Sequence, residues 1–151
     1  MADLRIMALT VQQPWAYAIL TGEKTVENRS WSTGYRGPLA IHAAARDDAA
    51  GHRDYRIIDL LARRGAHEDG VAYNHGAVIA VARLVDICSA TTPGHELRSH
   101  RVCECGPWRT PGQHHWQLAD VRPLDEPVRA RGRLGLWPIT LPAGVLEVTG
   151  G

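Results

Sequence analysis

Several residue types are scarce or missing from this 151-residue chain. It has no phenylalanine, three cysteines, and a single lysine, Lys24, beside sixteen arginines. It has no run of about eighteen apolar residues, so we predict no transmembrane helix. The odd number of cysteines (Cys88, Cys103 and Cys105), in a chain whose first residues do not resemble a signal peptide, argues against a disulfide framework. We therefore expect a soluble, cytoplasmic protein with reduced thiols.

The solitary lysine is conspicuous because arginine provides every other long cation. High Ala, Gly and Arg content is typical of a GC-rich coding sequence, in which lysine is easily replaced by arginine on solvated surfaces. A position that stays lysine is then a candidate for chemistry that needs a primary amine, with chance as the alternative. With a net charge of +1 the protein as a whole does not attract nucleic acid strongly. Any binding of nucleic acid therefore has to depend on a few charged residues at one site.

The hydrophobic pattern predicts a mainly-β fold of the α+β class. We expect strands over residues 5–11, 24–30, 38–43, 76–88 and 115–121, and a further apolar segment at 134–139. Helices are predicted over 13–20, ending at Gly22, and over 46–64, with Ile57, Leu60 and Leu61 as the buried side. Residues 91–113 are expected to be an irregular excursion. Short strands and tight glycine turns favour a small barrel, in one domain over residues 1–151.

Charged and aromatic residues crowd the segment after the first predicted helix. In order they are Lys24, Glu27, Arg29, Trp31, Tyr35 and Arg36, followed by His42 in the next strand. Glu27 and Arg29 are two residues apart and so share one face of a strand, whereas strict alternation puts Lys24 on the other face. Lys24 joins them only if it belongs to the turn after Gly22, where alternation does not apply.

If these side chains converge, two assignments of catalytic roles are possible. Lys24 is a base or nucleophile if burial or a nearby cation lowers its pKa from about 10.4, or it holds a substrate while Glu27 acts as acid or base. Arg29 and Arg36 suit phosphate or carboxylate groups, because a guanidinium binds oxyanions through two parallel hydrogen bonds. A plain ion pair between Glu27 and Arg29 is the structural alternative.

Three aromatic side chains, Trp31, Tyr35 and Trp116, offer planar faces on which a base can stack. Core packing is the competing role for Trp116. His42 lies in an apolar strand, which suits either the core or the edge of a cleft.

In this order the motifs resemble the ASCH domain, a relative of the PUA RNA-binding domains. The resemblance rests on Gln13-Pro14-Trp15, Gly22-x-Lys24-x-x-Glu27-x-Arg29, Trp31, Tyr35-Arg36-Gly37, His42, His115-Trp116-x-Leu118-x-Asp120-Val121-Arg122-Pro123-Leu124 and Gly132-x-Leu134-Gly135-Leu136-Trp137. It implies a small PUA-like β-barrel with flanking helices and a cleft on one side, and RNA or a nucleotide-like molecule as ligand. The candidate catalytic residues are Lys24 and Glu27, and the candidate ligand-binding residues are Arg29, Trp31, Tyr35, Arg36, His42 and Trp116.

The resemblance also leaves other functions open. Some proteins similar to this family are amidohydrolases that remove the acetyl group from N4-acetylcytidine with a Lys, a Thr and a Glu. Lys24 matches that lysine, but Glu27 stands where those enzymes carry threonine. A ribonuclease and a protein-interaction domain without a ligand are further alternatives.

A segment rich in cysteine and histidine invites a metal hypothesis. It contains His95, His100, Cys103, Cys105, His114 and His115. The Cys-x-Cys spacing is shorter than the usual separation of paired zinc ligands, and no second pair is clear. We therefore expect neither a metal nor another cofactor.

Overall fold

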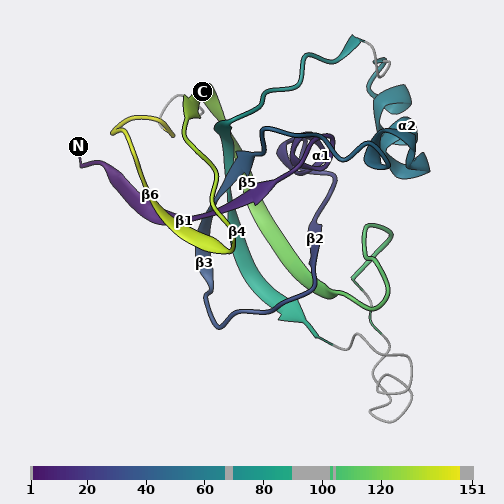
Figure 1. Ribbon diagram of the computed structural model, residues 1–151, viewed down its shortest axis with the longest axis horizontal. Coiled ribbons are helices and arrows are strands. Elements are labelled where there is room, and N and C mark those ends of the chain that lie inside the picture. The colour runs from purple at the N-terminus through teal and green to yellow at the C-terminus, as the bar shows by residue number, and fades with distance from the viewer. Residues whose placement is uncertain (1, 67–69, 90–102, 104, 147–151) are drawn as a thin grey trace.

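A six-stranded mixed sheet forms the body of the protein (Figure 1). The computed structural model describes residues 2–66, 70–89, 103 and 105–146. In chain order the elements are β1 (Leu4–Val11), α1 (Trp15–Leu20), β2 (Val26–Arg29), β3 (Gly37–Ala43), the 3-10 turn η1 (Gly51–Arg53), α2 (Tyr55–Arg63), β4 (Ala77–Cys88), β5 (His114–Arg129) and β6 (Leu136–Leu141). The strands lie in the order β2-β5-β4-β3-β1-β6, with β1 and β3 parallel and the other neighbours antiparallel.

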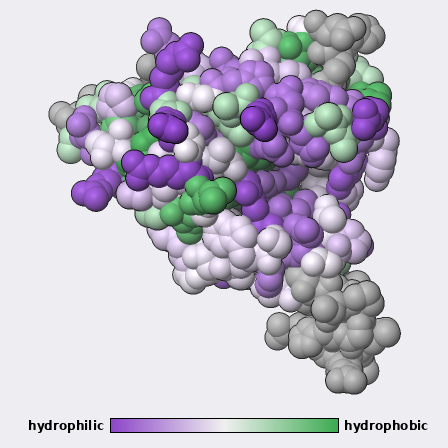
Figure 2. All heavy atoms as spheres, viewed as in Figure 1, coloured by the Kyte–Doolittle hydropathy of each residue, from purple (hydrophilic) through white to green (hydrophobic). Residues whose placement is uncertain are grey.

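Apolar residues cover both faces of the central strands. On β1, Leu9 and Val11 belong to one core cluster, and Ile6 and Ala8 belong to another. Because successive strand residues point to opposite faces, β1 is buried on both sides, and β3 divides its apolar residues in the same way. On the face drawn in Figure 2, hydrophilic residues dominate the surface and hydrophobic residues form small, separate patches.

The sheet confirms the mainly-β α+β class, but over the described residues it does not close into the predicted small barrel. Over the residues described, β2 and β6 are the two edges and do not pair with one another. Closure would require the free edge of β2 to bond a further strand while its other edge bonds β5. β2 has only four residues, so it presents few backbone groups for a second partner.

Both helices pack beside β2 in a third apolar cluster. It comprises Ala18, Val26, Ile57, Leu60, Leu61 and Trp108. The predicted buried side of α2 is therefore confirmed. The helix begins at Tyr55, not at residue 46, because the Asp54 carboxylate accepts a hydrogen bond from the backbone N–H of Arg56 (2.9 Å) and caps the first turn.

Most strand bounds differ from the prediction by a residue or two, and the end of β5 differs by more. β2 is shorter than residues 24–30, and β5 continues to Arg129 although its sequence contains Pro123 and Pro127. Proline lacks the N–H of a paired strand, and the ladder between β4 and β5 accommodates the irregularity through register shifts. Of the predicted excursion over 91–113, residues 91–102 and 104 lie outside the described residues, and 105–113 form turns and irregular chain. Among the described helices, none is long and apolar enough to cross a membrane.

Candidate functional site

A cleft of about 510 Å³ opens where β1, β2, α1 and the start of α2 meet. Its volume falls within the range of small-molecule sites. The lining residues are Thr10, Val11, Gln12, Trp15, Lys24, Glu27, Asn28, Arg29, Ser30, Trp31, Asp48, Arg56, Thr110 and Gln113. Four of the residues proposed from sequence, Lys24, Glu27, Arg29 and Trp31, are among them.

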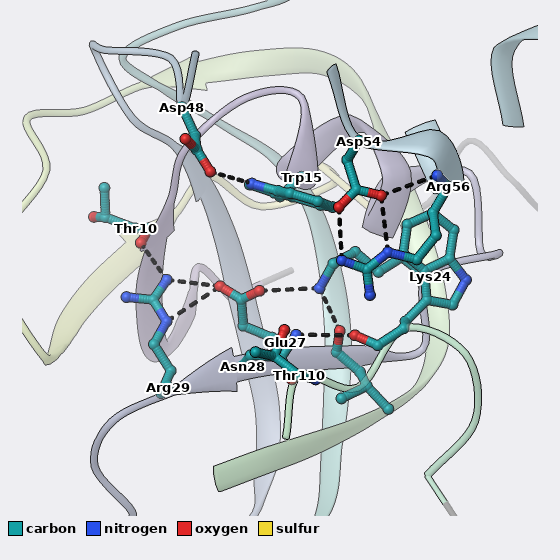
Figure 3. A network of polar contacts seen from close by, with 12 residues as sticks. Thr10, Trp15, Lys24, Glu27, Asn28, Arg29, Asp48, Asp54, Arg56 and Thr110 are labelled. Atoms are coloured by element: carbon teal, nitrogen blue, oxygen red, sulfur yellow. Dashed lines mark hydrogen bonds and ion pairs between the residues drawn. The ribbon is translucent and has the colours of Figure 1, made fainter. Parts of the chain in front are cut away.

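Lys24, Glu27 and Arg29 form a linked triad in this cleft (Figure 3). The Lys24 Nζ atom lies 3.0 Å from Oε1 of Glu27. Arg29 binds the other carboxylate oxygen, Oε2, through Nη2 at 2.8 Å and Nε at 3.1 Å. Lys24 and Glu27 are only 2% and 7% exposed. The carboxylate therefore bridges two cations, one buried and one facing the open cleft.

Convergence depends on where β2 begins. The strand starts at Val26, so Lys24 belongs to the irregular segment after α1 and does not follow strand alternation. Gly22 makes the reversal possible with a φ of +84°, and the backbone N–H of Lys24 then donates to the carbonyl of Ala18 (3.2 Å). The condition that the sequence left open is thus met.

Trp15 and Arg56 cover the ammonium group from the helical side. The Lys24 Nζ atom lies 5.7 Å from the centroid of the Trp15 ring, and the Arg56 guanidinium lies 5.5 Å from the same centroid. Asp54 holds the Arg56 fork at 2.9 and 2.8 Å. Asp48 accepts from the Trp15 indole N–H at 2.8 Å. Arg56 and Asp48 were not predicted as site residues, because nothing in their local pattern shows that the start of α2 meets α1.

Burial and charge set the protonation of the pair. Burial lowers the pKa of Lys24, and the nearby cations Arg56 and Arg29 lower it further against the opposing effect of Glu27. Burial raises the pKa of Glu27, but Lys24 and Arg29 together outweigh it, so that this pKa lies below its usual range. Glu27 is therefore a carboxylate at neutral pH, and Lys24 loses its proton more readily than an exposed lysine.

Arg29 and Trp31 are the groups placed to meet a ligand. Arg29 also donates from Nη2 to the carbonyl of Thr10 (2.7 Å), which fixes the guanidinium. Within the described part of the chain nothing accepts from its Nη1. Trp31 is half-buried against Trp116, edge to face with the ring centroids 4.8 Å apart. A fixed guanidinium and a supported indole thus border the cleft.

The other four candidates do not line the cleft. Trp116 is fully buried in the core and donates its indole N–H to the carbonyl of Trp31. His42 is also buried, with Nε2 2.6 Å from the carbonyl oxygen of Ala130. The Tyr35 hydroxyl donates to the carbonyl of Pro38, and Arg36 lies 3.5 Å from the exposed Asp86. These contacts support the sheet and the connection between β2 and β3.

Asn28 holds the chain segment that forms another wall of the cleft. Its side-chain amide donates to the carbonyl of Trp108 (2.9 Å), and its oxygen accepts from the backbone N–H of Thr110 (2.7 Å). This residue of β2 thereby holds the segment before β5 against the cleft.

Comparison with known proteins gives two findings. The family model described as the ASCH domain matches residues 9–128. Human activating signal cointegrator 1 is 53% identical over 38 residues, which are 25% of this chain and 6% of that protein. The matched stretch is thus a small part of the human protein.

Proposed function

The chain belongs to the ASCH domain family, and we propose that it binds RNA by taking one unstacked nucleoside of a single strand into the cleft. The observation that carries this proposal is the buried pair of Lys24 and Glu27, joined to the half-buried Arg29, at a cleft of about 510 Å³. Sequence-specific RNA recognition commonly targets unpaired bases that can leave the stack and enter a pocket.

One open donor at the cleft favours an electron-rich ligand. Three cationic side chains, Lys24, Arg29 and Arg56, line the cleft with the anionic Glu27 and Asp48, and Asp54 pairs with Arg56 beside it, so the local charges balance. The Nη1 group of Arg29 is the donor that these pairs leave open, and it suits a base carbonyl or a phosphate oxygen. The net charge of the whole chain is only +1, which fits a local contact better than a long basic track.

Each ligand group has a matching residue. The Trp31 ring offers a face on which a base stacks, and such stacking contributes about 1–3 kcal/mol. The Nη1 group of Arg29 offers a donor for the adjoining phosphate, while Nε and Nη2 stay on Glu27. The Lys24 ammonium, held on Glu27, reaches an acceptor of the base.

A direct test measures the affinity of the protein for short single-stranded RNA, hairpin RNA and single-stranded DNA at low salt. The variants are Arg29→Gln and Trp31→Ala, with Arg36→Gln as the matched arginine control outside the cleft, and circular dichroism checks that each is folded. We expect binding to single-stranded RNA that both cleft variants weaken and the control preserves. Absence of binding to every probe, or an equal loss in Arg36→Gln, would refute the proposal.

The lowered pKa of Lys24 specifically favours a second candidate function, the hydrolysis of an acylated nucleoside such as N4-acetylcytidine. In that reaction Lys24 in its neutral form would accept a proton from water as the water attacks the acetyl carbonyl, and would return it to N4 as the bond between the acetyl carbon and N4 breaks, which releases acetate and cytidine. Glu27 is the weaker base, because two cations hold its carboxylate. Turnover of N4-acetylcytidine that Lys24→Arg abolishes would support this candidate, and full activity in Lys24→Arg would exclude lysine chemistry.

A further inference from the structure

Three cysteines and one histidine gather at the end of the β4–β5 pair, outside the cleft. The ligand atoms of Cys88, Cys103, Cys105 and His115 all lie within 4.8 Å of one another. We propose that these four side chains bind one Zn²⁺ ion in a tetrahedral site that fastens the segment before β5. Three thiolates and one imidazole are among the ligand sets of structural zinc sites.

The sheet register creates half of the cluster. Cys88 ends β4 and is paired directly with His115 at the start of β5. Directly opposed residues of an antiparallel pair project from the same face, so a thiol and an imidazole meet there. Cys103 and Cys105 come from the chain just before β5, separated by one residue.

The distances suit a zinc ion with small side-chain adjustments. The Sγ atom of Cys103 lies 3.5 Å from Sγ of Cys88 and 3.0 Å from Nδ1 of His115. In a tetrahedral site with Zn–S near 2.3 Å and Zn–N near 2.0 Å, ligand atoms lie roughly 3.5–3.8 Å apart. The ligand atoms are therefore already gathered at about the spacing that zinc requires.

Hydrogen bonds from neighbouring groups orient the four side chains as metal ligands. The His115 Nε2 atom lies 2.8 Å from the carbonyl oxygen of Thr110, a contact that requires the proton on Nε2 and leaves the lone pair of Nδ1 toward the sulfurs. Gln117 donates its amide to Sγ of Cys105 (3.5 Å). Cys103 and His115 are buried, and Cys88 and Cys105 are half-buried, so the cluster is shielded yet reachable.

The donor set also selects the metal. Soft thiolates with imidazole favour Zn²⁺ over Mg²⁺ or Ca²⁺, which prefer oxygen ligands. A single disulfide would bond two of the three cysteines, and the third thiol and His115 would take no part in it. The tetrahedral metal site uses all four groups at once.

The site would act on the cleft through the chain that it fastens. The Thr110 carbonyl accepts a hydrogen bond from His115, and the Thr110 backbone N–H donates one to the side-chain oxygen of Asn28. Thr110 also lines the cleft. Trp108, in the same segment, packs with α1 and α2. A zinc ion at this cluster would therefore stabilise one wall of the cleft without touching a ligand there.

Spacing within the chain hid the cluster. The Cys-x-Cys pair looked incomplete because its remaining ligands are Cys88, at the end of another strand, and His115. Of the other histidines first considered, His95 and His100 lie outside the described residues. His114 points its Nδ1 at the Ser89 hydroxyl (2.9 Å) and is not one of the four, which makes it a matched control.

The test is the metal content of protein expressed with added Zn²⁺ and purified under reducing conditions without chelators. Mass spectrometry of the elements should find about one zinc ion per chain in the wild type and in His114→Ala, and a loss of zinc in Cys88→Ser and His115→Ala. Because a ligand variant can fail by misfolding, the intact metal-free wild type is also titrated with Co²⁺. Tetrahedral d–d bands and thiolate-to-cobalt charge-transfer bands, removed again by Zn²⁺, are expected.

Three results would overturn the proposal. The first is a folded wild type that takes up neither metal, and the second is an equal loss of zinc in His114→Ala and His115→Ala. The third is a disulfide between two of the cysteines in protein purified under the same reducing conditions. None of these measurements involves nucleic acid, so the outcome is independent of the proposed RNA binding.

Discussion

The Nζ atom of Lys24 lies 3.0 Å from Oε1 of Glu27, and both side chains are buried. The pair is not symmetric, because Arg29 holds the second carboxylate oxygen at 2.8 Å. Glu27 therefore keeps one cation if Lys24 is removed, whereas Lys24 keeps no carboxylate of its own if Glu27 is removed. That asymmetry gives the pair a measurable signature in stability and a defined protonation at neutral pH.

Glu27→Gln should destabilise the fold more than Lys24→Met. Removing the carboxylate leaves the buried Lys24 charge uncompensated, which costs about 3–5 kcal/mol. Removing the ammonium leaves Glu27 paired with Arg29, at a cost of about 1–3 kcal/mol. Urea denaturation of the two variants and the wild type measures the free energies of unfolding. Equal losses, or a larger loss in Lys24→Met, would contradict the asymmetry.

Acid stability should depend on Glu27. Its pKa is lower in the folded protein than the ordinary 4.5, so the unfolded chain binds this proton first as the pH falls. The stabilisation is present above pH 4.5 and is lost as the pH drops from there through the folded-state pKa. Unfolding free energies measured between pH 7 and pH 3 should decline less steeply for Glu27→Gln than for the wild type. Glu126→Gln, at an exposed position of β5, should keep the wild-type slope.

Arg29 should set part of the salt dependence of RNA binding. Each phosphate contact on a single strand contributes about 0.7 to the slope of log affinity against log salt concentration. Arg29→Gln should reduce that slope by about 0.7, and Arg36→Gln should leave it unchanged. Fluorescence anisotropy at several salt concentrations measures the slopes. The same slope in Arg29→Gln and the wild type would show that Arg29 makes no phosphate contact.

Asn28→Ala should loosen the wall formed by the segment before β5. The substitution removes the acceptor of the Thr110 N–H and the donor to the Trp108 carbonyl, and each lost contact costs about 1–3 kcal/mol locally. Hydrogen exchange at the Thr110 amide should become about tenfold faster or more. Asn74→Ala is the control, because the contact of Asn74 with Gln13 uses its backbone carbonyl. Unchanged exchange at Thr110 would mean that another contact holds the wall.

Local sequence was sufficient for the features that depend on neighbouring residues. The turn at Gly22 follows from turn chemistry, and the buried side of α2 follows from helical spacing, whereas the strand predicted over 24–30 still included Lys24. The triad was therefore predictable as far as one condition, the residue at which β2 begins. Trp31 was accessible to the same reasoning, because it follows a strand rich in charge.

Features that depend on distant segments were out of reach. Arg56 faces the cleft because α2 packs beside α1, and Cys88 meets His115 because β4 and β5 pair in one register. Neither relationship produces a periodic pattern of residues that can be recognised in the sequence. The sheet does not close into the predicted small barrel for a similar reason, since whether an edge strand pairs with a second strand is a property of the whole sheet. Trp116 and His42 lie in the interior because side chains from distant segments cover them, Trp31 over Trp116 and Trp137 over His42.

The most direct test of the cleft is the side-chain resonance of Lys24, which is the only lysine in the chain. Protein grown with isotope-labelled lysine gives one side-chain amine signal, which can be titrated with pH and then with short single-stranded RNA. We predict that Lys24 titrates below its ordinary 10.5 and that its signal shifts when RNA binds. A pKa at or above 10.5, or RNA binding that leaves the signal unmoved, would contradict a ligand site built on Lys24.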